Sequence, residues 1–136
     1  MSEENEDVAR RFQEAFAAGD RASLEEIVAE DVVDHTPRPG QPPGRQPLLD
    51  AVAGFAAGFP DLEITVEQVV AEGDLVVQYG VMTGTNAGEW MGMPATNRPV
   101  SVAFMDMHRV VGGTVTESWH LEDIAGMLQQ LGVAGD

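Results

Sequence analysis

Two carboxylates near the C-terminus, Glu117 and Asp123, lie in a segment whose other residues are mostly large and apolar. Side chains alternate between the two faces of a strand, so Val115, Glu117, Trp119, Leu121 and Asp123 are expected to share one face. A carboxylate among apolar neighbours either finds hydrogen bonds or has its pKa raised by desolvation, and a raised pKa suits a general acid or base near neutrality. The sequence therefore predicts a closed-ended apolar pocket lined by Glu117, Trp119 and Asp123.

A structural interpretation of the same carboxylates stays open. Asp123 precedes a short helical segment, where Asp is a common N-cap. Glu117 would then lie at the sheet edge in water. Spacing alone does not separate a helix cap from a catalytic carboxylate.

A second candidate pair, Asp106 and His108, lies in the preceding segment. Alternation puts both on one face with Val102, Phe104 and Val110, and it turns the side chain of Arg109 to the other face. A histidine beside a carboxylate can relay a proton or orient a substrate oxygen. A structural hydrogen bond or a solvated polar patch explains the pair equally well.

The histidines His35, His108 and His120 do not stand at a spacing typical of metal ligands, and there is no cysteine. Neither an HxH nor an HExxH pattern occurs, so we expect no metal site. His35 follows Asp34 at the end of an extended segment, where it either reaches the mouth of a pocket or closes a turn.

The elements that must position these residues follow from periodicity. Helices are predicted over residues 3–18, over a short stretch capped by Asp20 or Ser23, and over 47–59, and an extended piece over 31–35. Residues 37–47 hold five prolines and two glycines and predict a loop. Strands are predicted over 62–72, 75–86, 98–111 and 114–122, and a helical turn over 123–132. Helices followed by an antiparallel meander indicate an α+β fold with helices packed on one side of a curved sheet.

Length and charge exclude several classes of protein. The 136 residues fit one domain spanning 1–136, with an ordered core at about 5–132. The net charge of −16 leaves no basic face for nucleic acid. The acidic N-terminus and the lack of a long apolar run predict neither a signal peptide nor a membrane span, so a cytoplasmic location is expected. The absence of Lys excludes Schiff-base chemistry.

Ordered blocks along almost the whole chain resemble a known family. They are Phe59-Pro60-Asp61-Leu62, Val69 to Asp74, Gly84-Thr85, Met91 to Thr96, Glu117-Ser118-Trp119 with Asp123, and Gln130-Leu131-Gly132. Together they look like the SnoaL-like polyketide cyclases of the nuclear transport factor 2-like superfamily.

The resemblance implies a cone-shaped α+β barrel, in which helices and a strongly curved sheet enclose a cavity. It also implies a cofactor-independent enzyme of secondary metabolism and antibiotic biosynthesis that closes a ring of a hydrophobic polyketide by intramolecular aldol condensation. The position of Asp123 matches the family's general acid/base, and His108 and Asp106 lie near positions that orient substrate carbonyls. The side chains expected to contact substrate are His35, Tyr79, Trp90, Met93, Phe104, Glu117 and Trp119.

Two alternatives follow from relatives with the same fold. An epoxide hydrolase or epoxide-opening cyclase would need a carboxylate pair, for which Asp34 or Asp61 with Glu63 or Glu117 are the candidates. A non-catalytic small-molecule-binding or accessory module would need no reactive pair.

Self-association is also expected. Met105, Met107 and Val111 would leave apolar area in water on the outer side of the sheet. A homodimer or a higher homo-oligomer would cover this area.

Overall fold

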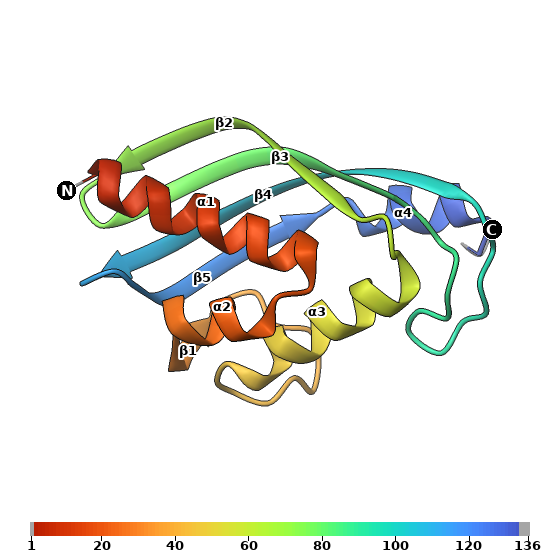
Figure 1. Cartoon of the computed structure of the whole chain (residues 1–136), viewed down its shortest axis with the longest axis horizontal. Helices are drawn as coiled ribbons and strands as arrows, with labels where there is room; N and C mark the ends of the chain where they lie inside the picture. The colour runs from red at the N-terminus through yellow and green to blue at the C-terminus, as the bar shows by residue number, and fades with distance from the viewer. Residues whose placement is uncertain (1, 134–136) are drawn as a thin grey trace.

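The computed structural model describes residues 2–133 and has an α+β architecture (Figure 1). Its elements are α1 (Ser2–Ala18), α2 (Arg21–Ile27), β1 (Val28–Asp34), α3 (Gln46–Gly58), β2 (Glu63–Glu72), β3 (Leu75–Thr85), β4 (Pro99–Val111), β5 (Thr114–Glu122) and α4 (Ile124–Leu131). The five strands form one sheet in the order β1-β5-β4-β3-β2. The expected α+β fold is confirmed, and each of the four long strands begins and ends within one residue of its predicted bounds.

The first strand is longer than predicted because it pairs with a distant part of the chain. β1 runs parallel to β5, with Val28 opposite Val115 and Asp34 opposite Ser118, whereas the other neighbouring strands are antiparallel. At the start of α2, Asp20 is the N-cap and accepts hydrogen bonds from the backbone nitrogen and hydroxyl of Ser23. Asp20 and Ser23, the two residues predicted as alternative caps, therefore both belong to this cap, Asp20 as the acceptor and Ser23 as the donor.

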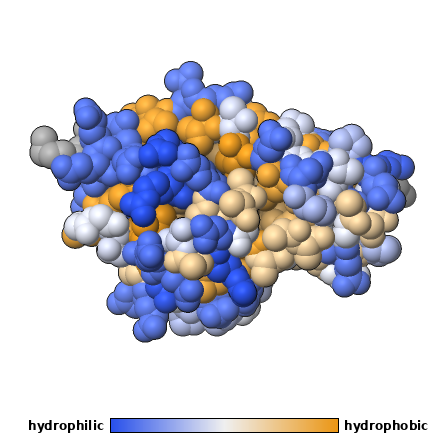
Figure 2. Space-filling view, viewed as in Figure 1, coloured by the Kyte–Doolittle hydropathy of each residue, from blue (hydrophilic) through white to orange (hydrophobic). Residues whose placement is uncertain are grey.

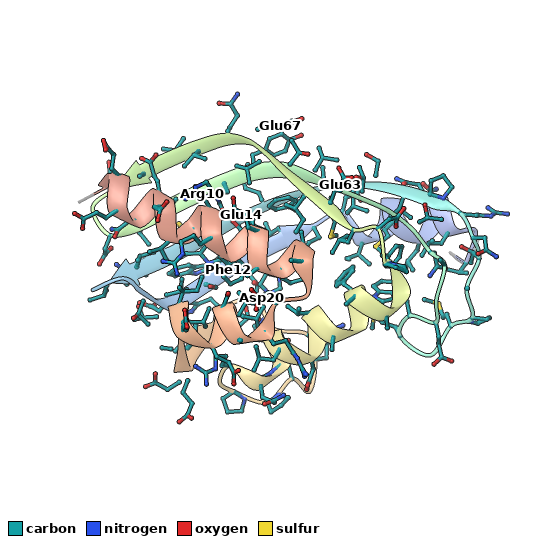
Figure 3. The ribbon with its side chains drawn as sticks, viewed as in Figure 1. Arg10, Phe12, Glu14, Asp20, Glu63 and Glu67 are labelled. Atoms are coloured by element: carbon teal, nitrogen blue, oxygen red, sulfur yellow. The ribbon has the colours of Figure 1, made fainter. Side chains whose placement is uncertain are left out.

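One face of the sheet is covered by helices, and we call it the helix-covered face. Figure 1 shows α1 lying across the sheet, with α2 and α3 next to it. Phe12 of α1 places its ring centroid 4.5 Å from that of His108, whereas Arg10 and Glu14 of the same helix pair with each other in solvent (Figure 3). The predicted shared face of β4 is confirmed, since its members alternate with more exposed residues and are all buried: Val102, Phe104, Asp106, His108 and Val110.

A β-bulge between β4 and β5 separates Val115 from the residues of β5 that were predicted to share its face. Arg109 pairs with Glu117, but Val110 pairs with Val115, so Thr116 is an extra residue on β5. Val115 therefore faces the helices with Val110, whereas Glu117 shares the opposite face with Arg109. Glu117, Trp119 and Leu121 share one face as predicted, but the placing of Val115 on that face is wrong, because the bulge inverts the alternation after Val115.

The interior consists of two apolar clusters. One surrounds Val8, Leu24, Val52 and Val115 under α1 and α2. The other surrounds Phe59, Trp90 and Met127 at the far end of α3, where the Phe59 and Trp90 rings meet edge to face at 5.7 Å. The side of α3 that faces solvent exposes alanines. Figure 2 shows hydrophilic residues, in blue, over α1 and weakly hydrophobic residues, in pale orange, beside them. No described helix has the length and apolarity needed to cross a membrane.

Gly80 gives a test of how tightly the sheet packs. A Cβ at Gly80 would meet the backbone oxygen of Thr65, and it would lie 2.9 Å from the Phe104 ring. A Cβ at Gly54, inside α3, would meet nothing within 4 Å. We expect Gly80→Ala to lower the free energy of unfolding by about 1–3 kcal/mol through overpacking, and the control Gly54→Ala to raise it by about 0.5–1 kcal/mol through helix propensity. Urea denaturation measures both, and a neutral Gly80→Ala would contradict this packing.

Candidate active site

A compact polar group lies buried on the helix-covered face. It consists of Gln13 from α1, Gln78 from β3, and Asp106 and His108 from β4. The exposed fractions of these residues are 5%, 1%, 8% and 1%. Gln78 lies directly opposite Asp106 in the β3–β4 pairing, and α1 brings Gln13 over both.

One side-chain amide holds two of these groups. Gln13 Nε2 donates to Asp106 Oδ2 at 2.6 Å and to Gln78 Oε1 at 3.0 Å. Within residues 2–133, Asp106 Oδ1 and His108 Nε2 are buried and have no hydrogen-bond partner. Buried polar atoms without partners are rare and call for an explanation such as a role at a functional site.

The His108 ring is fixed on its other side. His108 Nδ1 lies 2.8 Å from Ser118 Oγ, and Phe12 packs against the ring. His108 Nε2 lies 3.4 Å from Asp106 Oδ2, an arrangement that suits a proton on Nε2 with Ser118 donating to Nδ1. A hydrogen-bond donor and a carboxylate thus lie side by side, so His108 Nε2 can donate to a carbonyl oxygen and Asp106 can accept from an enol hydroxyl of the same compound.

A second polar group surrounds His120, which directly faces Asp106 across β4 and β5. His120 Nε2 lies 3.0 Å from Asp34 Oδ2, and His120 Nδ1 lies 2.9 Å from Glu122 Oε1. The hydrogen bond to Glu122, assisted by that to Asp34 and opposed by burial, raises the pKa of His120 to about 9. Burial alone would raise the pKa of Asp34, but hydrogen bonds from His120, Gln41 and Thr36 outweigh it and lower that pKa. At neutral pH an imidazolium therefore lies between two carboxylates.

Glu117 and Trp119 lie on the outer face of the sheet, away from the helices. Glu117 accepts hydrogen bonds from His35 at 2.8 Å and Arg109 at 2.6 Å, and His35 stacks on Trp119 with ring centroids 4.3 Å apart. The hydrogen bond from His35, together with Arg109, lowers the pKa of Glu117. The predicted pocket lined by Glu117, Trp119 and Asp123 is therefore wrong, and the Glu117 carboxylate has found hydrogen bonds, one of the two outcomes expected for it.

Asp123 takes the structural position that the sequence left open. Its Oδ1 accepts from the backbone nitrogen of Gly126 at 2.9 Å and caps α4, and its side chain is exposed. This cap uses one oxygen of the carboxylate. A further role of Asp123 in proton transfer stays a prediction.

The remaining predicted contact residues are dispersed. Phe104 is buried on the helix-covered face beside Asp106. Trp90 and Met93 pair with each other in loop 86–98 and pack into the second apolar cluster. Tyr79 is 36% exposed and pairs with Met105 on the outer face. The structure thus brings Phe104, Asp106 and His108 together and separates them from Tyr79.

The structure separates Asp34 from Glu117, one of the carboxylate pairs considered for epoxide opening. Asp34 pairs with Ser118 and Glu117 with Val33, so Asp34 and Glu117 lie on opposite faces of the sheet. Asp61 accepts a hydrogen bond from the Thr85 backbone at 2.7 Å, which lowers its pKa. No group of three or more potential ligands is placed to hold a metal ion in the described part of the chain.

Four polar residues of the helix-covered face escaped the sequence prediction: Gln13, Gln78, Ser118 and His120. Gln13 follows Phe12 in the apolar stripe of the first helix, and Gln78 alternates with Val76 and Gly80. A glutamine at a position where the pattern expects an apolar residue indicates a buried polar contact, and this was the signal that could have identified both residues. Two hollows of about 520 and 490 Å³ lie elsewhere, around the Gly112–Gly113 turn and around Asp20. Neither contains Asp106 or His108, which lie closed off from solvent.

Comparison with known proteins gives concordant matches. Residues 6–131 match the family model for SnoaL-like polyketide cyclases. The chain is 30% identical over 121 residues to nogalonic acid methyl ester cyclase of Streptomyces nogalater, covering 87% of this chain and 90% of that protein. IdmH of Streptomyces antibioticus superposes with a TM-score of 0.81 at 38% identity, over 95% of this chain and 99% of that one. TsrD of Streptomyces laurentii superposes with a TM-score of 0.88 at 25% identity, over 98% of each chain.

The pKa of His120 predicts how stability changes with pH. Because folding raises this pKa from 6.5 to about 9, the stabilisation is fully present below pH 6.5 and is lost as pH rises through about 9. The shift corresponds to at most about 3 kcal/mol, and screening of a ring that is 36% exposed reduces this to about 1 kcal/mol. Urea denaturation from pH 6 to 10 should show this fall, and His120→Gln should flatten it. An equal slope in His120→Gln would assign the dependence to other groups.

Proposed function

The chain belongs to the SnoaL-like polyketide cyclase family, and on that premise we propose that it closes a ring of a polyketide by intramolecular aldol condensation. The observation that supports this chemistry best is the buried pair of Asp106 and His108, in which Asp106 Oδ1 and His108 Nε2 have no hydrogen-bond partner among the described residues. The pair offers an acceptor and a donor in an apolar surrounding, where hydrogen bonds to a developing charge are strongest.

The proposed reaction needs a carbon whose proton is already acidified by flanking carbonyls. A carboxylate removes this proton, and the resulting enolate attacks a second carbonyl of the same molecule to form the new carbon–carbon bond. The carboxylic acid then returns the proton to the new alkoxide. No electrons are exchanged with a cofactor, and one residue serves as base and then as acid.

We assign the proton transfer to Asp123 and the hydrogen bond to the reacting carbonyl to His108, whose ring Asp106 orients. Asp123 directly follows β5, the strand that carries Ser118 and His120 on the helix-covered face. Its helix cap occupies Oδ1, so Oδ2 is the oxygen proposed to transfer the proton. Nogalonic acid methyl ester is the first substrate to test, because a relative is named as its cyclase.

Asp123→Asn separates the cap from the chemistry. Asn caps helices about as well as Asp but cannot take up a proton, so the free energy of unfolding should change by less than about 0.5 kcal/mol. We expect kcat to fall at least about 100-fold, within the range of general acid–base catalysis. Product formation is followed by chromatography, with Asp123→Ser as a second capping control. Full activity of Asp123→Asn would refute the assignment.

Asp106→Asn and His108→Gln test the second half of the proposal. Both variants retain hydrogen-bonding groups close to the shape of the original side chain. We expect each to lower kcat/KM by about 10- to 100-fold, as for loss of one transition-state hydrogen bond. If Asp106→Asn abolishes turnover while Asp123→Asn does not, Asp106 is the acid/base.

We also propose that the outer face joins two copies in a homodimer. Its exposed apolar residues include Val33, Met105 and Leu121, which are 49%, 49% and 69% exposed. At its centre Arg109 forms ion pairs with Asp74 and Glu117, and His35 is hydrogen bonded to Glu117. The chain has a net charge of −16, so two copies repel each other. Because acidic groups on this face are paired with Arg109, the repulsion between two copies that meet here is reduced.

Leu121→Glu tests this interface. A charge in the centre of an apolar contact should make the protein monomeric, with little effect on folding because Leu121 is exposed. Light scattering after size-exclusion chromatography gives the mass. The control Val69→Glu changes a residue that is 42% exposed and pairs with Gln78 on the other face. A monomeric wild type, or equal masses for wild type and Leu121→Glu, would contradict the interface.

A further inference from the structure

The connection between β1 and α3, residues 35–45, is a long segment with little regular structure. Its four prolines limit the conformations of the free chain, so a few contacts are enough to fix it. Gln41 Nε2 donates to Asp34 Oδ2 at 2.9 Å, and the Thr36 hydroxyl and backbone nitrogen both contact Asp34 Oδ1. Segment 35–45 is thus folded back on Asp34.

His120 joins this arrangement to β5 by three contacts. Its backbone nitrogen donates to Thr36 Oγ1 at 2.8 Å, and its ring nitrogens contact Asp34 and Glu122. The carboxylates come from the ends of two neighbouring strands, β1 and β5. The His120 ring therefore reaches segment 35–45 through Asp34, which accepts from Thr36 and Gln41. The two ends of the segment are bound to the sheet separately, by the backbone nitrogens of His35 and Arg45, which donate to Ser118 and Glu30.

Segment 35–45 in turn contacts loop 86–98. Arg38 Nη1 lies 3.6 Å from the sulfur of Met91. Met91 has φ of 50°, a left-handed conformation that is rare for a side chain of this kind, and it is 61% exposed. The arrangement that begins at His120 thus extends to a loop that packs on the far end of α3.

These contacts lie next to the proposed site. His120 and Asp106 are direct neighbours across β5 and β4 on the helix-covered face, but His120 is 36% exposed at its side chain and Asp106 only 8%. Outward from Asp106 along this face, the next side chains are His120 of β5 and then Asp34 of β1.

We propose that His120 is a positioning residue: bound between Asp34 and Glu122, its ring fixes the Asp34 carboxylate, to which Thr36 and Gln41 of segment 35–45 are hydrogen bonded. The importance of this for catalysis rests on the function proposed above, but the holding itself does not. The charged groups that face His120 are Asp34 from β1, Glu122 from β5 and its register partner Asp106 from β4.

Amide hydrogen exchange of the full chain at pH 7 tests the holding directly. In segment 35–45 the backbone nitrogens of Thr36, Arg38 and Gln41 are hydrogen bonded, so their exchange reports its order. We expect His120→Gln to speed exchange over residues 36–41 at least tenfold, with β3 and β4 unchanged. Glu122→Gln, which removes one of the two carboxylates, should have a smaller effect. The control Glu63→Gln removes a carboxylate on β2 at the opposite edge of the sheet and should behave as wild type (Figure 3).

The ring of His120 provides a readout that a purely structural role would not move. Titration of its ring resonances by NMR should give a midpoint near pH 9 in wild type and a lower midpoint in Glu122→Gln. Unchanged exchange over residues 36–41 in His120→Gln overturns the proposal, and so does an equal acceleration over the whole chain.

Kinetics then connects the holding to function. With nogalonic acid methyl ester, His120→Gln should raise KM at least fivefold while kcat changes less than threefold, because the reacting groups are retained. A fall in kcat with unchanged KM would overturn the positioning role. If wild type does not turn over this compound, the aldol proposal fails for it, and the exchange result still decides whether His120 holds the segment.

Discussion

The arrangement of the whole candidate site depends on one irregularity of hydrogen bonding, the β-bulge at Thr116. Before the bulge, Val115 contributes to the core, and after it the alternation of β5 is inverted. Ser118 and His120 therefore join His108 and Asp106 under the helices, and Glu117 and Trp119 turn outward. A regular strand would place a glutamate and a tryptophan against Phe12 and would leave His108 without its serine partner. The bulge thus determines which polar side chains of β5 lie on the helix-covered face and which lie on the outer face.

The sequence predicted those parts of the fold whose signals are local. The bounds of β2 to β5 follow from period-two patterning and turn residues, and the buried face of β4 follows from its uninterrupted alternation. The predicted face of Val115 was wrong because Thr116, unlike a glycine, gives no sign of a bulge. The early start of β1 at Val28 was missed because it depends on parallel pairing with Val115, a contact across the length of the chain.

Only the part of the candidate site that depends on local sequence patterns could be predicted. Asp106 and His108 lie two residues apart on one strand, so alternation was enough to pair them. Gln13 contacts Asp106 across 93 positions of sequence, and no local pattern contains that information. A glutamine in the apolar stripe of α1 does indicate that a buried partner must exist, because an unpaired buried amide is costly. It does not indicate where the partner lies.

Burial explains why the two histidines of the helix-covered face have different partners. An ion pair in the interior loses much of its Coulomb attraction to desolvation, so charges are cheaper where water still reaches. His120 is half-buried and lies between two carboxylates. His108 is almost fully buried, and its hydrogen-bonding partner is the hydroxyl of Ser118, while the amide of Gln13 holds Asp106. Neutral hydrogen-bonding groups thus fix the buried pair without supplying a counter-ion. The ionic contacts at the edge fix the neighbouring backbone instead.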